Sequence, residues 1–407
     1  MKLHHSASPA LALLLSATLP IHAADPVVAN VVSAQQAGTK LVDITFDVSD
    51  ADSDTLSMSV EISDDSGTSF LVPVTALSGD TSVSATPTPT SKALVWDASV
   101  DFNQQFNSTM VVRVIADDGS SPKPPPAGMV LIPAGPFEMG RQSSSGGSDE
   151  LPVHTVTVSA FYLDQFEVTK ALWDDVQAWA VQPANGYNFG NNFGNAASGQ
   201  GAFHPVHTVN WYDCVKWCNA RSQKEGLTPV YYTDAGFTTV FKTGEGTAPF
   251  ANWSANGFRL ATEAEWEKAA RGTLVGNTYP WGNSITGADA NYSGSGDPFE
   301  PGANPDTTPV GYYDGDQVPA GANRANNYGL YDMSGNVWEW CWDLYDGSYY
   351  GSSPATDPRG PTSASGARVL RGGSWLFITN GLRCAGRGLS NPEFGSFYIG
   401  FRSARGL

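Results

Sequence analysis

The chain has 407 residues, 41% of them hydrophobic, and a formal net charge of −18 at pH 7. This length favours two domains over one. Nucleic-acid binding needs a basic surface that neutralises phosphates, so the acidic balance argues against a nucleic-acid partner. The same balance fits a soluble extracellular protein.

Residues 1–24 have the pattern of a secretory signal peptide. Lys2 and two histidines form a short basic start, an apolar run extends from Leu11 to Leu19, and Ala23 ends a plausible cleavage site. The apolar run is too short to span a bilayer, and no later stretch is long enough. We therefore expect an exported protein, extracellular or periplasmic, with no membrane span.

Residues 25–119 are predicted to be all β-structure. Apolar and polar residues alternate along residues 42–48, 56–62 and 110–114, and clusters of Gly, Ser, Asp and Pro separate these stretches. This pattern predicts an immunoglobulin- or fibronectin-like sandwich that serves as a spacer or adhesion module.

An acidic turn formed by Asp50, Asp52 and Asp54 follows the first of these stretches. Thr55 stands where an EF-hand needs glycine, which argues against that motif. A looser calcium site at a strand end and a solvated acidic turn both remain open.

A proline-rich linker over residues 120–127 leads to a second domain, residues 128–407, predicted to be α+β and rich in loops. Eleven of the twelve tryptophans follow the linker, and their large apolar area compensates for sparse regular structure. We expect helices over Lys170–Ala180, over 214–225 after an Asn210 cap, and over 263–270. The last begins with a capping box of Thr262 and Glu265.

An ordered series of motifs runs through the second domain. The clearest are Gly128–Gly135, Phe258–Glu267, Tyr328–Trp340, Arg371-Gly372-Gly373-Ser374-Trp375 and Ile399-Gly400-Phe401-Arg402. Together they resemble the formylglycine-generating enzyme, or sulfatase-modifying factor, family over residues 128–405. The resemblance implies a C-type-lectin-like fold for this domain.

The resemblance also implies structural calcium. Two sets of residues match calcium ligands of the family. The first set is Asp332, Gly335, Val337 and Glu339. The second set contains Asn291 and Tyr292, with either Asp297 or Asp306 as its acidic member. Carboxylate and carbonyl oxygens are suitable calcium ligands. The alternative is that the two carboxylates of the first set only accept hydrogen bonds from loop N–H groups.

The two cysteines that bind copper in the enzymes of this family are missing from this chain. These enzymes bind Cu(I) through two thiolates and convert a substrate cysteine to formylglycine. Ser374 matches an active-site serine, but the two cysteine positions fall at Phe377 and within residues 381–382. Cu(I) prefers thiolate ligands, and a phenylalanine cannot replace one, so we do not expect copper.

The four cysteines are Cys214, Cys218, Cys341 and Cys384. Export permits disulfides, and four cysteines allow three pairings. In each disulfide bridge that the family resemblance implies, one of the two positions is not a cysteine in this chain. Cys341 and Cys384 are therefore candidates for a bridge with each other.

The tail also resembles the variable proteins of diversity-generating retroelements, which share this fold and end on a similar Ile-Gly-Phe-Arg motif. Six residues in the corresponding window are candidate ligand contacts: Trp375, Phe377, Thr379, Asn380, Phe397 and Tyr398. Aromatic residues among small polar ones suit recognition of a protein or glycan surface. We therefore predict a secreted, non-catalytic ligand-binding protein; the alternative is a sulfatase-maturation oxidase or a related metal-dependent oxidase.

Overall fold

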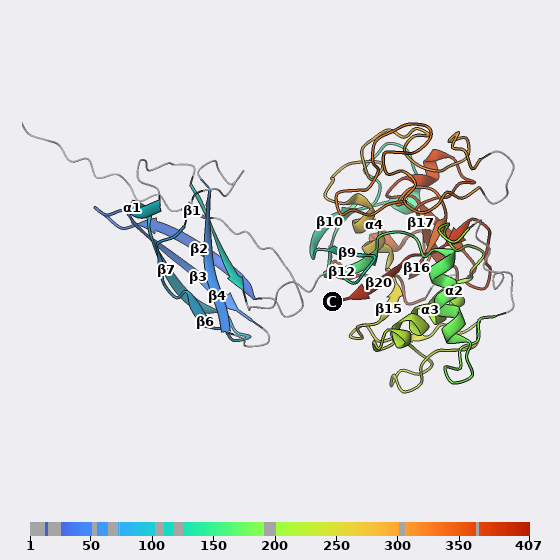
Figure 1. Ribbon diagram of the computed structural model, residues 1–407, viewed down its shortest axis with the longest axis horizontal. Helices are drawn as coiled ribbons and strands as arrows, with labels where there is room; N and C mark the ends of the chain where they lie inside the picture. Colours follow the sequence, from blue (N-terminus) through green and yellow to red (C-terminus); the bar gives the residue numbers. More distant parts are fainter. Residues whose placement is uncertain are drawn as a thin grey trace, which may run out of the picture. The chain divides into compact units, whose positions relative to one another are not determined.

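The computed structural model describes residues 13–14, 26–50, 55–63, 72, 74–101, 110–117, 125–190, 201–300, 306–363 and 366–407. The chain divides into two compact units, Met1–Pro124 and Pro125–Leu407 (Figure 1). Most of the predicted signal peptide, Asp52, Asp54 and most of the predicted linker lie outside the described residues. Within the described ranges, no helix is both long and apolar enough to cross a membrane.

Where the first unit is described, it has two antiparallel sheets and one short helix, α1 (Ala98–Asp101). The larger sheet has the order β1 (Leu13–Leu14), β2 (Val27–Gln35), β3 (Leu41–Ser49), β7 (Thr90–Asp97), β5 (Leu77–Gly79). The smaller has the order β6 (Ser82–Ser84), β4 (Thr55–Ser63), β8 (Val111–Asp117).

The predicted alternation is confirmed along β3 and β4, whereas on β8 the neighbouring residues Val111 and Val112 are both buried. Ile44, Phe46 and Val48 are buried on β3, as are Leu56 and the alternate apolar residues that follow it on β4. Apolar residues of both sheets join one core cluster that includes Trp96, so the two sheets bury a common face.

The second unit is mostly strands and loops. One four-stranded sheet has the order β15 (Phe258–Leu260), β20 (Ser403–Gly406), β12 (Phe161–Asp164), β9 (Met129–Ile132). The other has the order β18 (Arg387–Ser390), β17 (Arg368–Arg371), β16 (Trp338–Leu344), β19 (Ile399–Gly400). Two further antiparallel pairs lie in the described part of this unit: β10 (Gly135–Met139) with β11 (His154–Val158), and β13 (Tyr231–Tyr232) with β14 (Phe250–Ala251).

In the described part of this unit, three α-helices pack around these sheets: α2 (Lys170–Ala180), α3 (Trp211–Lys224) and α4 (Glu263–Arg271) (Figure 1). Their caps are the predicted ones. The Asn210 side chain accepts a hydrogen bond from the Asp213 N–H, and Thr262 with Glu265 forms the capping box of α4. Short 3-10 turns η1 (Ser148–Glu150), η2 (Tyr349–Gly351) and η3 (Thr379–Leu382) lie in the loops.

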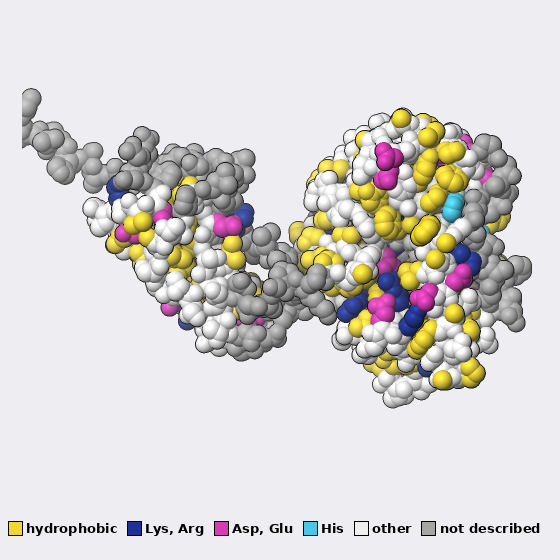
Figure 2. Space-filling model, viewed as in Figure 1, with side chains coloured by type: hydrophobic (Ala, Val, Ile, Leu, Met, Phe, Trp, Pro, Cys, Tyr) yellow, Lys and Arg dark blue, Asp and Glu magenta, His cyan; other side chains and the backbone are white. Residues whose placement is uncertain are grey.

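Tryptophan packing holds the loop-rich second unit together. Trp173 of α2 stacks on Trp217 of α3 with ring centroids 5.8 Å apart, and Phe401 packs edge-on against both rings. The Trp211 indole N–H donates to the Cys341 carbonyl at 2.9 Å, so burial of its ring leaves no orphaned donor. Figure 2 shows hydrophobic side chains scattered over the visible face of this unit, with Lys and Arg lying beside Asp and Glu.

Candidate functional site

A cavity of about 470 Å³ opens on the β18–β17–β16–β19 sheet, at the positions where the family's catalytic cysteines were expected. Apolar side chains from four segments form much of its lining: Trp338, Phe377, Ile378, Leu389 and Tyr398. Asp149 and Glu150 of η1, Asn380, Arg383 and Arg387 form the polar part.

The aromatic rings of the lining pack edge to face. Phe377 lies 5.6 Å from Trp338 and 5.5 Å from Tyr398, measured between ring centroids. Ile378 is 70% exposed, Leu389 52% and Phe377 37%. Where the enzymes are expected to carry a thiol, this chain therefore presents an exposed apolar surface.

Two glycines at the end of β17 allow η3 to pack closely against this strand. Gly372 and Gly373 have φ values of 93° and 77°, which favour glycine. A Cβ atom on Gly373 would lie 2.7 Å from a methyl carbon of Leu382. The Gly-Gly pair of the motif thus seats η3 against the end of β17.

Four of the six predicted contact residues lie in or beside the cavity. Phe377, Asn380 and Tyr398 line the cavity, and Phe397 lies beside them with its ring 5.3 Å from Tyr398. Thr379 is half-buried in η3. Trp375 does not offer the accessible surface that a ligand contact needs: it is 5% exposed, and its ring packs against Phe397.

Ser374, the match to a family active-site serine, is fully buried. Its hydroxyl has no hydrogen-bond partner among the described residues, and its carbonyl accepts from the Phe377 N–H at 2.9 Å. A hydroxyl in this position is closed to an external substrate.

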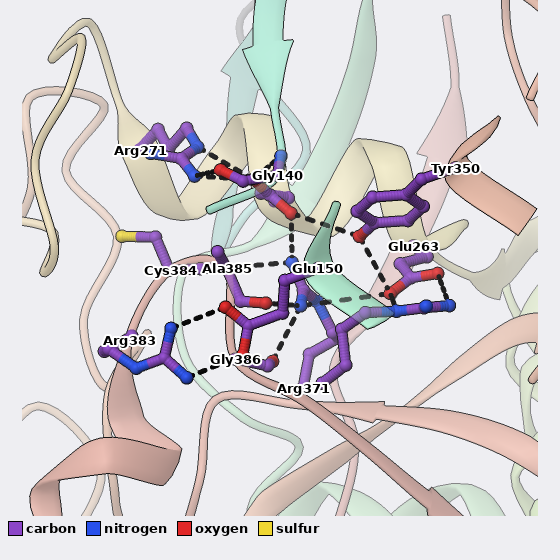
Figure 3. Close-up of polar contacts among 12 residues, drawn as sticks. Gly140, Glu150, Glu263, Arg271, Tyr350, Arg371, Arg383, Cys384, Ala385 and Gly386 are labelled. Atoms are coloured by element: carbon purple, nitrogen blue, oxygen red, sulfur yellow. Dashed lines mark hydrogen bonds and ion pairs between the residues drawn. The ribbon is translucent and has the colours of Figure 1, made fainter. Parts of the chain in front are cut away.

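Beneath the cavity, Arg371 of β17 binds the loop that follows η3 (Figure 3). Its guanidinium donates to the carbonyl oxygens of Cys384 at 2.8 Å, Ala385 at 2.9 Å and Gly386 at 2.6 Å. It also donates to the Glu267 carboxylate of α4. Burial alone would raise the pKa of Glu267, but Arg271 and Arg371 hold it below its ordinary value.

Two further ion pairs fix the cavity wall. Arg383 makes a bidentate contact with Glu150, both distances 2.6 Å, and also donates to the Asn380 carbonyl at 2.8 Å. Arg387 donates to both Glu263 carboxylate oxygens, at 2.7 and 2.9 Å. The partners of each pair are 233 and 124 residues apart, so these contacts could not be read from the sequence.

All four cysteines are buried free thiols, so the expected bridge between Cys341 and Cys384 is wrong. The Cys384 carbonyl is held by Arg371 of β17, the strand that pairs with the one carrying Cys341. Burial raises the pKa of Cys384 to about 12 and the pKa of Cys341 well above its ordinary value. Both thiols therefore act as small apolar core groups.

The first proposed calcium set is largely engaged in protein contacts. Both Glu339 carboxylate oxygens bond to Arg402, at 2.8 to 3.0 Å, and one also accepts from the Trp266 indole N–H at 2.7 Å. Asp332 accepts from the Gly311 N–H at 2.6 Å. Burial, together with the charge of Glu339, raises the pKa of Asp332 to about 6.

A third carboxylate, Glu167, belongs to this buried group and was not predicted. Burial and the charges of Asp332 and Glu339 raise its pKa well above the ordinary value. Its oxygens accept from the Asn336 amide at 3.1 Å and from the Val337 N–H at 3.4 Å. Glu167 lies far from Asp332 and Glu339 in the sequence, which is why their association could not be read from it.

The second proposed calcium set has oxygens without partners. Asn291 Oδ1, Asp306 Oδ1 and Thr308 Oγ1 are buried and have no hydrogen-bond partner among the described residues, while the Asn291 amide donates to the Asp306 carbonyl at 2.7 Å. Asp297, the other acidic candidate, already accepts from Ser295 Oγ at 2.7 Å and the Phe299 N–H at 2.9 Å. The geometry therefore favours Asp306 as the acidic member.

No cluster of three or more His, Cys, Asp or Glu side chains in the described ranges is arranged to hold a metal ion. A cation beside Asn291 would then rely on amide, hydroxyl and backbone oxygens in addition to one carboxylate. Such oxygen ligands suit Ca²⁺ and do not suit Cu(I).

Two short-stranded sheets, long ordered loops and a tail cavity define the second unit as a C-type-lectin-like domain. The chain belongs to the family described as "Sulfatase-modifying factor enzyme 1-like domain", whose model matches residues 116–407.

Relatives of different kinds share this domain. The chain is 34% identical to the formylglycine-generating enzyme of Streptomyces coelicolor, covering 68% of this chain and 88% of that enzyme. It is 33% identical to the chaperone protein LppX of Paenibacillus barcinonensis, over 62% of this chain and 80% of that protein. The solved structure of Treponema denticola variable protein 1 is 29% identical, with a TM-score of 0.52 over 69% of this chain and 95% of that one.

Proposed function

We propose that the chain is a secreted, non-catalytic protein whose tail cavity binds a protein or glycan ligand. One observation carries this proposal. The positions expected to hold the catalytic cysteine pair form an exposed cavity with Phe377 and Tyr398 in its lining, and the chain's four thiols are buried.

The form of the cavity supports recognition. A volume of about 470 Å³ lies within the range of ligand sites, which combine apolar walls with a few placed polar groups. Aromatic side chains offer large contact area with few rotatable bonds, so ordering them on binding costs little entropy. The likeness to a variable protein and to a chaperone supports a family role that extends beyond oxidation.

A binding screen of the full chain against glycan and surface-protein arrays tests the proposal. We expect Phe377→Ala and Tyr398→Ala each to weaken the strongest hit about tenfold or more, as for central aromatic contacts. Phe250→Ala is the matched control, because Phe250 is 49% exposed on β14 and does not line the cavity. Absence of any ligand, or equal losses in all three variants, would contradict the proposal.

We also propose a structural Ca²⁺ ion at Asn291, with Asp306 and the Tyr292 carbonyl as further ligands. The unpaired buried oxygens of Asn291 and Asp306 support it, because buried acceptors without partners are costly. A divalent cation there would supply positive charge that orders a loop with little regular structure.

The first unit completes the proposal. We assign it as an immunoglobulin-like spacer or adhesion module, and its two antiparallel sheets with a shared core support this assignment. Export itself rests on the apolar N-terminal pattern.

A further inference from the structure

One wall of the tail cavity is the edge of a β-sheet. Within the described residues β18 pairs only with β17, and its residues Gly388, Leu389 and Ser390 line the cavity. In an antiparallel pair, alternate residues direct their N–H and C=O groups away from the partner strand. The outer side of β18 therefore presents backbone groups suited to pairing with another chain.

Apolar surface flanks this edge. The Trp338 ring lies against β18 so closely that a Cβ atom on Gly388 would stand 3.1 Å from it. Leu389, 52% exposed, and Ile378, 70% exposed, border the same space. A strand laid along β18 would thus find an apolar surface beside its backbone partners.

The arginine side chains around the cavity are engaged in internal contacts, so they offer few hydrogen-bond donors to an anionic or sugar ligand. The Arg383 guanidinium is taken up by Glu150 and Asn380, and that of Arg387 by Glu263 and the carbonyls of Asp149 and Asp346. Asp149 differs, because its carboxylate accepts from the Tyr345 hydroxyl at 2.8 Å and forms no salt bridge within the described part of the chain. The two arginines of the lining are thus engaged by other carboxylates, and Asp149 presents a carboxylate at the cavity that a cationic side chain can approach.

We propose that the ligand is an extended polypeptide segment of a partner protein that adds a strand to β18. An apolar side chain of this segment packs over Trp338 and Phe377, and a Lys or Arg side chain lies at Asp149. Backbone pairing supplies affinity and the alternate side chains supply specificity, as in other strand-addition complexes. The inference rests on the proposed binding role of the tail and names the class of partner.

Selection from a displayed library of random dodecapeptides on the full chain tests this inference. We expect enriched sequences with apolar residues at alternate positions and a Lys or Arg nearby. A synthetic copy of the best peptide, N-methylated at alternate residues, should lose about tenfold or more in affinity in the register that blocks pairing, and little in the other. This comparison needs no protein variant, so misfolding cannot explain it.

Two protein variants test the side-chain contacts. Asp149→Asn should weaken the Lys-bearing peptide about two- to fivefold and leave a Gln-bearing copy unchanged. Leu389→Ser should weaken both peptides, whereas Val275→Ser, at a residue 79% exposed outside the cavity, should weaken neither.

Several results would overturn the inference. These are a library that yields no cavity-dependent peptide, equal affinity in both N-methyl registers, or a glycan hit that Phe377→Ala abolishes. The last result would leave the proposed binding function standing while excluding a strand as the ligand. If the tail bound no ligand of any kind, both the proposed binding function and the strand-addition inference would be contradicted.

Discussion

The ion pair of Arg383 and Glu150 joins two parts of the chain that are 233 residues apart and forms one end of the cavity. The two side chains are 5% and 4% exposed, so water does little to screen either charge. A buried pair of this kind holds its loops in place chiefly because either partner alone would be an uncompensated charge.

This leads to a prediction at the residue scale. Arg383→Met should lower the free energy of unfolding by about 3–5 kcal/mol, because Glu150 stays buried without its partner. The double variant with Glu150→Met should recover much of that loss. Urea unfolding measures both.

The matched control is Lys170→Met, which breaks a pair with Asp174 whose side chains are 23% and 52% exposed. Exposed pairs contribute about 0–1 kcal/mol, so this variant should stay close to the parent. A similar loss in both single variants would show that burial does not set the contribution of the Arg383 pair.

Individual site residues were predictable only where a motif marked them. Phe377, Asn380 and Tyr398 fall in a window bounded by two motifs, and the structure brings them to one cavity. Asp149 and Glu150 were missed because η1 lies far away in sequence and carries no signal of its own. Trp375 was misplaced because the sequence does not reveal that Phe397 covers it.

At the scale of elements, local signals succeeded and long-range ones were absent. The helices α2 and α4 match their predicted ranges to within a residue, since side-chain caps mark their first turns. Helix α3 begins at Trp211, three residues earlier than predicted, directly after its Asn210 cap. Strands of two residues such as β19 have too short a pattern to read, and their pairing depends on distant segments.

The segment from Asn291 to Thr308 carries the calcium prediction. Added Ca²⁺ should raise the thermal unfolding midpoint by a few degrees, since a bound ion at about 100 times its Kd contributes about 2.7 kcal/mol. A chelator should reverse the shift, and Asn291→Ala or Asp306→Asn should abolish it. Scanning calorimetry with and without the ion measures the midpoint.

Asp297→Asn is the control for that segment. Asp297 already has protein partners, so this variant should keep the Ca²⁺-dependent shift even if its starting midpoint is lower. Loss of the shift in this variant, and its retention in Asp306→Asn, would assign the acidic ligand to Asp297 instead.

For the whole molecule, the fold class was predicted more fully than its chemistry. Ordered motifs over two thirds of the chain identified the family, which the comparison confirms. The same motifs do not indicate which thiols are accessible to a substrate. Burial of all four cysteines, a property of the assembled domain, decides that question.

The corresponding prediction concerns the oxidase reaction. The reduced full chain, incubated with Cu(I), oxygen and a Cys-x-Pro-x-Arg peptide, should form no formylglycine, because its thiols are buried and their pKa values are raised. Mass spectrometry of the peptide measures the product. The Streptomyces coelicolor enzyme is the positive control, and product above background from this chain would favour the oxidase function.

The contacts of Arg371 have a consequence for how this surface can change. Its guanidinium holds the loop after η3 through three main-chain oxygens, which every amino acid possesses. The side chains at positions 376–380 take no part in that attachment. Residues 376–380 can therefore change without removing these three bonds, which is what directed evolution of new specificities on a fixed scaffold requires.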